Sequence, residues 1–197
     1  PAATSNVVAA VRHDAGGNHP VEERVAEETP VALVYNGVPH VVVMCTPKDI
    51  EDLVLGFSLT EGIIETAAEL GGIEIVAESV GCTAYLSVPA ERMAAIETRR
   101  RNMAARTGCG LCGAETIEQA IRALPKVQGL KRVDSQSLVR AMAALPALQG
   151  LNAATGATHA AGWADVRGDV TLVREERLGP VLQLAENERR NLRRREL

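Results

Sequence analysis

The chain has 197 residues, of which 46% are hydrophobic and 23% are charged, and this size and balance predict a soluble globular protein of one domain or two small ones. Aromatic residues make up only 2% of the chain, which disfavours the stacking of nucleic-acid bases on aromatic rings. The formal net charge of -4 also argues against a general nucleic-acid binder.

No stretch of the sequence is apolar for long enough to cross a bilayer, and the N-terminus lacks the basic and apolar segments of a signal peptide. We therefore expect a cytoplasmic protein that inserts in no membrane. Disulfides are rare in that compartment, so the four cysteines are interpreted as core thiols, metal ligands or reactive groups. Cys45 and Cys82 lie in apolar, strand-like runs and are predicted to be small buried hydrophobes.

Residues 1–20 show no period and are predicted to be a flexible N-terminus, with order beginning near Val21. Two apolar runs, 31–35 and 38–45, flank Asn36-Gly37, the dipeptide most typical of a tight hairpin. A helix follows, with Thr46 as its N-cap, Pro47 at its first position and Gly62 at its end. The first half of the chain therefore predicts a mixed sheet with at least one covering helix.

The rest of the chain continues this mixed pattern. Strands are predicted at 72–76 and 82–88, and helices at 91–106, 117–124 and 135–145. A loop over 150–158 should precede a second hairpin, formed by 159–164 and 170–174, with Trp163 as its core anchor. Four arginines lie near the end of the predicted helix at 91–106, namely Arg99, Arg100, Arg101 and Arg106. They either interact favourably with the helix dipole or form a basic rim for an anionic ligand.

The residues best suited to chemistry are Cys109 and Cys112, which form a CxxC pair inside a glycine-rich run ahead of a helix pattern. Thiolates at a helix start are favoured by unpaired backbone N–H groups and by the helix dipole. Such a pair can be half of a zinc site, a dithiol redox centre or a carrier of persulfide sulfur. The chain has no second CxxC to complete a zinc site, so we expect no tightly bound metal. The glycines favour a mobile loop that presents sulfur to large partners.

Several motifs together resemble the formate dehydrogenase accessory sulfurtransferase family, over about residues 25–175. They are Glu28 with Pro30, Asn36-Gly37, the stretch 53–57 followed by 60–64, Cys109 to Gly113, and the stretch 155–161. The resemblance implies an α/β (α+β) fold, with an N-terminal mixed sheet-and-helix domain over 21–106. A partial cytidine-deaminase-like α/β domain that carries the CxxC pair would follow over 107–176. Residues 177–197 are polar and charged, which predicts a tail that is a solvated helix or disordered.

The resemblance also implies a function. The chain would accept sulfur as a persulfide from a cysteine desulfurase and pass it to the molybdenum or tungsten bis-guanine-dinucleotide cofactor of formate dehydrogenase. By motif position Cys109 and Cys112 are the catalytic sulfur carriers, and which of them accepts sulfur first stays open. Thr155, Gly156 and His159 are candidates to bind the cofactor. The implied partners are the desulfurase, formate dehydrogenase and a second copy of the chain in a homodimer.

The resemblance ends after Arg174-Glu175, so that the deaminase-like domain is expected to be truncated or divergent. This departure keeps two other hypotheses open. One is a non-catalytic scaffold or inactive truncated homologue, which binds the desulfurase, the cofactor or the dehydrogenase without completing transfer. The other is a zinc-stabilised domain.

Overall fold

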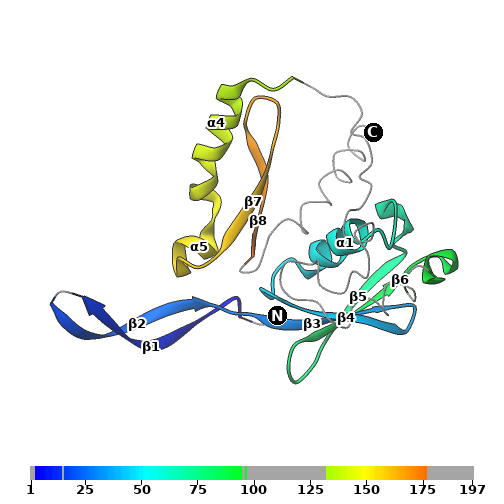
Figure 1. Cartoon of the computed structure of the whole chain (residues 1–197), viewed down its shortest axis with the longest axis horizontal. Helices are drawn as coiled ribbons and strands as arrows, with labels where there is room; N and C mark the ends of the chain where they lie inside the picture. Colours follow the sequence, from blue (N-terminus) through cyan, green and yellow to red (C-terminus); the bar gives the residue numbers. More distant parts are fainter. Residues whose placement is uncertain (1–2, 15, 95, 97–131, 177–197) are drawn as a thin grey trace, which may run out of the picture.

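The computed structural model of the chain describes residues 3–14, 16–94, 96 and 132–176, and Figure 1 shows how their helices and strands are arranged. The strands of this part form a four-stranded sheet and two separate two-stranded hairpins. Helices and strands of mixed orientation confirm the predicted α+β class. In this part of the chain no helix is both long and apolar enough to span a bilayer.

The four-stranded sheet is built on a hairpin of β3 (Thr29–Tyr35) and β4 (Val38–Cys45). Asn36 and Gly37 connect the two strands with positive φ angles of 47° and 81°, as a tight turn between twisted antiparallel strands requires. The Asn36 side chain also donates to the Val88 carbonyl at 2.8 Å and accepts from its N–H at 3.0 Å. The predicted hairpin is confirmed, and its turn is tied to the end of a distant strand.

The other two strands of this sheet are β5 (Gly72–Ala77) and β6 (Cys82–Ser87), which pair antiparallel with each other. β6 also pairs in parallel with β3, giving the strand order β4-β3-β6-β5. Helix α1 (Ile50–Thr60) and the short 3-10 helix η1 (Ala67–Glu69) lie on the connection from β4 to β5. Figure 1 shows α1 lying across one face of the sheet, and we call this assembly of β3–β6 and α1 the sheet unit.

The sheet unit owes its core to side chains that α1 and the two central strands bury together. The main contributors are Leu53, Val54 and Phe57 from α1, Val31, Leu33 and Tyr35 from β3, and Ala84 and Leu86 from β6. The Tyr35 hydroxyl lies 2.7 Å from the Ser58 hydroxyl in this core. Cys45 and Cys82 are also buried, which confirms their prediction as small core residues.

The start of α1 differs from the prediction. Thr46 and Pro47 were expected as N-cap and first residue, but the helix begins at Ile50 with Asp49 as its N-cap. The Lys48 N–H donates to the Thr46 carbonyl at 2.7 Å, so these residues form a turn that precedes the helix. Asp49 then adopts a left-handed conformation with φ of 52° and ψ of 39°, which short polar side chains tolerate better than most. The predicted end at Gly62 is confirmed, because Gly62 has a φ of 63°.

The prediction of a flexible N-terminus over residues 1–20 is contradicted for most of its length. Strands β1 (Ser5–Asp14) and β2 (Gly17–Ala26) form an antiparallel hairpin, which extends away from the sheet unit (Figure 1). Val7 and Val8 lie opposite Arg24 and Glu23, so neither face of the hairpin is uniformly apolar. The alternation that marks a half-buried strand is therefore missing from the sequence.

Residues 135–176 form a helix–hairpin unit made of two helices, a 3-10 turn and an antiparallel hairpin. Its elements are α4 (Ser135–Ala144), η2 (Leu145–Leu148), α5 (Gly150–Thr155), β7 (His159–Ala164) and β8 (Val170–Glu176). The predicted helix over 135–145 and the predicted hairpin are confirmed. The Asp134 side chain caps α4 by accepting from the Gln136 N–H at 3.3 Å.

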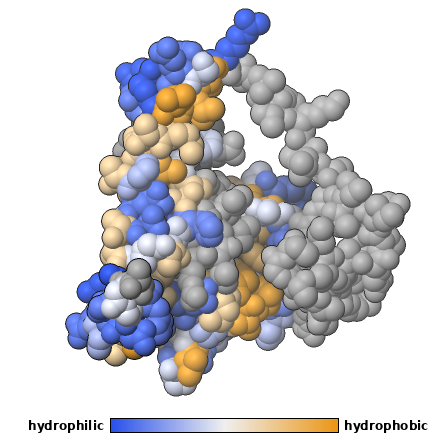
Figure 2. All heavy atoms as spheres, turned by 60° about the vertical axis from the view of Figure 1, so that its left-hand side comes forward, coloured by the Kyte–Doolittle hydropathy of each residue, from blue (hydrophilic) through white to orange (hydrophobic). Residues whose placement is uncertain are grey.

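Two expectations for the helix–hairpin unit are wrong. The stretch 150–158 was predicted as a loop, yet α5 forms there because the Glu175 carboxylate accepts from the Leu151 and Asn152 N–H groups at 3.0 and 2.7 Å. Trp163 was expected to anchor a core but is 37% exposed. Large apolar side chains of α4 are exposed as well, namely Leu138, Val139 and Met142. Figure 2 shows orange and tan surface on the side that carries this helix.

Several predictions lie outside the described residues. These are the helix at 117–124, the four arginines at 99–101 and 106, most of the helix at 91–106, and the tail over 177–197. At the start of the helix predicted for 91–106, residues 90–94 and 96 are helical. Arg92 there binds Glu69 at 2.7 Å and Glu65 at 2.9 Å, so this helical segment is fixed against η1. The proposed domain boundary near residue 106 stays a prediction.

Candidate functional site

The residues predicted for the site fall into two groups in the structure. Cys109 and Cys112 lie outside the described residues. Thr155, Gly156 and His159 lie close together in sequence where α5 ends and β7 begins. A pocket between α1, β5, β6 and β8, which the sequence did not predict, lies in the described part as well. The junction of α5 with β7 and this pocket are therefore the two candidate sites in the described part of the chain.

At the junction, Thr155 and Gly156 take part in ending the helix. The Thr155 hydroxyl donates to the Leu151 carbonyl at 2.8 Å and accepts from the Ala157 N–H at 3.4 Å. Gly156 has a left-handed φ of 63° and donates its N–H to the Asn152 carbonyl at 2.7 Å, as the residue after a helix often does. These local bonds give both residues a structural role.

His159 occupies a different position, as the first residue of β7 opposite Glu176 of β8. The residue is exposed, so its imidazole is accessible to a ligand or a partner. Thr158, which precedes it, donates its N–H to the Asn152 side chain at 3.3 Å. His159 is thus an exposed residue at the first position of a paired strand.

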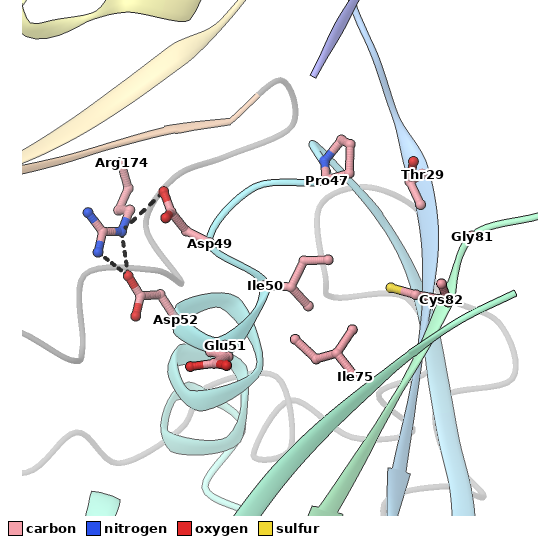
Figure 3. A pocket seen from close by; sticks show the side chains of 11 residues that line it. Thr29, Pro47, Asp49, Ile50, Glu51, Asp52, Ile75, Gly81, Cys82 and Arg174 are labelled. Carbon is pink, nitrogen blue, oxygen red and sulfur yellow. Dashed lines mark hydrogen bonds and ion pairs between the residues drawn. The ribbon is translucent and has the colours of Figure 1, made fainter. Parts of the chain in front are cut away.

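The pocket has a volume of about 460 Å³ and two walls of different chemistry. Its polar wall consists of Asp49, Glu51 and Asp52 at the start of α1, together with Arg174 from β8. Its apolar wall is formed by Pro47, Ile50, Ile75 and Ala77, next to Thr29, Gly81 and Cys82. Figure 3 shows Arg174 directed at the two aspartates, with Ile50 and Ile75 facing each other farther inside.

Arg174 connects the helix–hairpin unit to the sheet unit. Its Nε and Nη2 both contact Oδ2 of Asp52, and its Nε lies 3.5 Å from Oδ2 of Asp49. The side chains of Arg174 and Asp52 are only 12% and 8% exposed, so this is a largely buried ion pair. Removing one partner of such a pair leaves the other charge desolvated without compensation. Arg174 therefore fixes β8 against the first turn of α1.

The Arg174–Asp52 pair was missed by sequence reasoning because its partners lie 122 residues apart. No helical or strand period extends over such a separation. The one available signal was the abrupt change in β8 from apolar residues to Arg174-Glu175. Charged residues at the end of a strand indicate polar partners elsewhere in the fold, but they do not say which ones.

Cys82 brings a thiol to the edge of the pocket, and Figure 3 shows its sulfur directed inward. Burial raises the pKa of this thiol, and the charge of nearby Glu78 raises it further. A neutral thiol is a weak nucleophile, because the thiolate is the reactive form. The structure therefore disfavours Cys82 as a sulfur carrier.

A metal has no evident site in the described part of the chain, where no three His, Cys, Asp or Glu residues are grouped to hold one. The carboxylates of Asp49 and Asp52 are directed at Arg174 instead (Figure 3). The chemical role that these residues support is an ion-pair connection between the helix–hairpin unit and the sheet unit, beside a partly apolar pocket.

Comparison with known proteins places these observations in a family. Residues 26–176 match the family model described as the FdhD/NarQ family. The sulfur carrier protein FdhD of Xanthomonas axonopodis pv. citri is 48% identical over 165 residues, which are 84% of this chain and 59% of that protein. The protein of the same name from Bordetella petrii is 47% identical over 154 residues, covering 78% of this chain and 55% of its own length.

A solved structure agrees at the level of the fold. It is a protein of Desulfotalea psychrophila described as a formate dehydrogenase accessory protein, with a TM-score of 0.61 and 19% sequence identity. The match covers 94% of this chain and 66% of that one. The chain thus spans less than two thirds of the length of these relatives. Because the family model covers most of its residues, the chain belongs to the FdhD/NarQ family.

Proposed function

We propose that the chain carries sulfur for the maturation of formate dehydrogenase, with Cys109 and Cys112 as the carriers. The observation that supports this most is the glycine-flanked CxxC pair, which lies inside the stretch that matches the family model. The relatives at 46–48% identity are named sulfur carrier protein FdhD. The other two cysteines are buried, and the pKa of Cys82 is raised, so the CxxC pair is the better choice in this chain.

Loading is a sulfur transfer without net oxidation. The thiolate of Cys109 or Cys112 attacks the terminal sulfur of a persulfide on a cysteine desulfurase. A new S–S bond forms on this chain, and the desulfurase cysteine leaves as a thiolate. The glycines at 108, 110 and 113 let the backbone around the two thiols adopt conformations closed to other residues.

The second cysteine then has two balanced routes. In a relay, its thiolate attacks the terminal sulfur, so that the persulfide moves across and the first cysteine leaves as a thiolate. In a release, it attacks the inner sulfur, hydrosulfide departs, and a Cys109–Cys112 disulfide forms that a dithiol reductant must reset. The acceptor in this proposal is the molybdenum or tungsten bis-guanine-dinucleotide cofactor before it enters formate dehydrogenase.

The junction of α5 and β7 is the proposed contact for that cofactor. His159 is exposed on a fixed strand, and Thr155 and Gly156 shape the turn beside it. We assign His159 the direct contact and the other two the positioning of the loop. The protein acts in the cytoplasm as a homodimer, with the desulfurase and formate dehydrogenase as its partners.

Sulfur loading tests the proposal. The full chain is incubated with a cysteine desulfurase and cysteine labelled in its sulfur, and reducible label on the chain is measured. We expect the Cys109→Ala, Cys112→Ala double variant to lose the label. The matched control is the Cys45→Ala, Cys82→Ala double variant, which removes two buried thiols and should keep it.

The possible outcomes separate the competing functions. Equal label on the parent and on the variant without Cys109 and Cys112 overturns the carrier role. Binding of the desulfurase without any label supports the non-catalytic scaffold instead. Stoichiometric zinc in freshly purified protein, lost together with Cys109 and Cys112, supports a zinc-stabilised domain.

A further inference from the structure

The outer edge of β1 is open in the described part of the chain. β1 pairs with β2 alone, in a sheet of two strands. The hairpin extends away from the sheet unit (Figure 1), and Val7 and Val11 of β1 are each 52% exposed. An exposed strand edge carries unpaired N–H and C=O groups that can accept another strand.

The ladder of the hairpin determines which backbone groups face this edge. The Glu27 N–H donates to the Thr4 carbonyl at 2.9 Å, so even-numbered residues of β1 hydrogen-bond to β2 and odd-numbered residues face outward. The position of Pro20 is consistent with this pattern. Pro20 has no N–H, and it lies opposite Val11, in a pair that forms no hydrogen bonds between β1 and β2. The outward-facing residues of β1 are Ser5, Val7, Ala9, Val11 and His13.

The two edges of the hairpin differ in their chemistry. On β2 the outward positions include Pro20, Glu22 and Arg24. Proline and charged residues are the usual means of preventing a strand edge from pairing. The outward positions of β1 contain no proline, lysine, arginine or carboxylate. One edge is therefore protected, and the other is suited to accept a strand.

We propose that the β1 edge pairs antiparallel with β1 of a second copy of this chain, around a two-fold axis at Ala9. In this register Ala9 lies opposite the partner's Ala9, Val7 opposite the partner's Val11, and Ser5 opposite the partner's His13. All outward N–H and C=O groups of these residues gain partners. The two hairpins then form one continuous four-stranded sheet, in the order β2-β1-β1-β2.

The sequence of β1 matches itself in this arrangement, which favours a second copy over an unrelated strand. Between the hydrogen-bonded pairs, Val8 lies opposite the partner's Ala10, and Asn6 opposite the partner's Arg12. Apolar residues thus meet apolar ones, and no like charges face each other. A two-fold interface requires such self-complementarity, since the same patch serves on both subunits. The pairing gives a surface to the homodimer proposed above, and it rests on that part of the proposed function.

Two proline variants test the pairing by sedimentation velocity of the full chain over a wide concentration range. Ala9→Pro removes an outward N–H of β1, whereas Glu22→Pro removes one from the opposite position of the same hairpin pair. Both should disturb the hairpin to a similar degree. We expect Ala9→Pro to weaken self-association at least about a hundredfold, from several lost hydrogen bonds, and Glu22→Pro to leave it unchanged.

Amide hydrogen exchange gives an independent readout. In the parent, the N–H groups of Val7, Ala9 and Val11 should exchange slowly only at concentrations where the chain associates. Those of Val8 and Ala10 should be protected at all concentrations, because β2 accepts from them. A monomeric parent, equal loss in both variants, or protection of Ala9 that is independent of concentration would overturn the pairing. Oligomeric state and label uptake are separate measurements, so the pairing can fail while sulfur transfer holds.

Discussion

The sheet unit and the helix–hairpin unit are stabilised in different ways. In the sheet unit, α1 and the strands bury a single cluster of aliphatic and aromatic side chains. In the helix–hairpin unit, by contrast, Leu138, Val139 and Met142 are exposed. Two largely buried polar contacts hold it in place, from Arg174 to α1 and from Glu175 to α5. Apolar burial therefore dominates the first unit, and a few specific polar contacts position the second.

The same substitution in both units should give the largest difference. Leu33→Ala empties a fully buried position of β3, whereas Leu138→Ala truncates a side chain of α4 that is 61% exposed. We expect the first variant to lose about 2–5 kcal/mol of unfolding free energy, from lost burial and the remaining cavity. The second should stay within about 0.5 kcal/mol of the parent. Urea denaturation measures both, and similar losses in the two variants would contradict the contrast.

Arg174 should have the next largest effect. Arg174→Met keeps the volume of the side chain but leaves Asp52 buried without its partner, and we expect a loss of about 3 kcal/mol. Arg167→Met is the matched control, because Arg167 pairs with Asp165 and Asp169 while 76% exposed, and such pairs contribute less than about 1 kcal/mol.

A double variant tests the cause of the Arg174 effect. In Asp52→Asn, Arg174→Met no charge of the pair remains buried, so part of the lost stability should return. Two results would contradict the proposed role of the ion pair. One is an equal loss of unfolding free energy in Arg174→Met and Arg167→Met. The other is a double variant that is no more stable than Arg174→Met alone.

The smallest expected effect concerns pH and the turn between β7 and β8. The Asp165 carboxylate accepts from the Asp169 N–H at 3.0 Å and the Arg167 N–H at 2.8 Å. These bonds and the Arg167 side chain lower the pKa of Asp165 below its ordinary value of 3.8. A carboxyl whose pKa is lowered in the folded state contributes stability at pH values above its ordinary pKa. This contribution is lost as pH falls through the folded-state pKa.

We therefore expect Asp165→Asn to unfold at a lower temperature than the parent at neutral pH, and the difference to shrink in strong acid. Thermal unfolding over that pH range measures the effect. Asp169→Asn is the control, since it removes a charge from the same turn but keeps the carboxylate that accepts the two N–H groups. If the difference in unfolding temperature between Asp165→Asn and the parent stays constant with pH, the charge of the carboxylate does not contribute to stability.

The elements that the sequence predicted correctly are those specified locally. Asn36-Gly37 determines the β3–β4 hairpin, because both positive φ angles occur at residues that tolerate them. The apolar spacing around Phe57 and the stop at Gly62 similarly give α1 its face and its end. Such signals lie within a few residues of each other and need no knowledge of the rest of the fold.

The elements that were missed depend on contacts across the chain or on backbone pairing alone. The sequence of α5 is typical of a loop. The helix forms because Glu175 of β8 caps its first turn. β1 and β2 pair without an apolar face. Backbone hydrogen bonds alone impose no alternation of apolar and polar residues, so the sequence did not indicate these strands. For the site, the CxxC pair was visible in the sequence, whereas the pocket and its arginine required the fold.

The long separation between Asp52 and Arg174 has a consequence for synthesis on the ribosome. The last strand of the sheet unit ends at Ser87, whereas Arg174 follows much later in the chain. At about 5–20 residues per second, the interval lasts on the order of ten seconds. During that time the sheet unit can fold before Arg174 is available to pair with Asp52. Until translation delivers this arginine, the Asp52 carboxylate depends on water for its solvation.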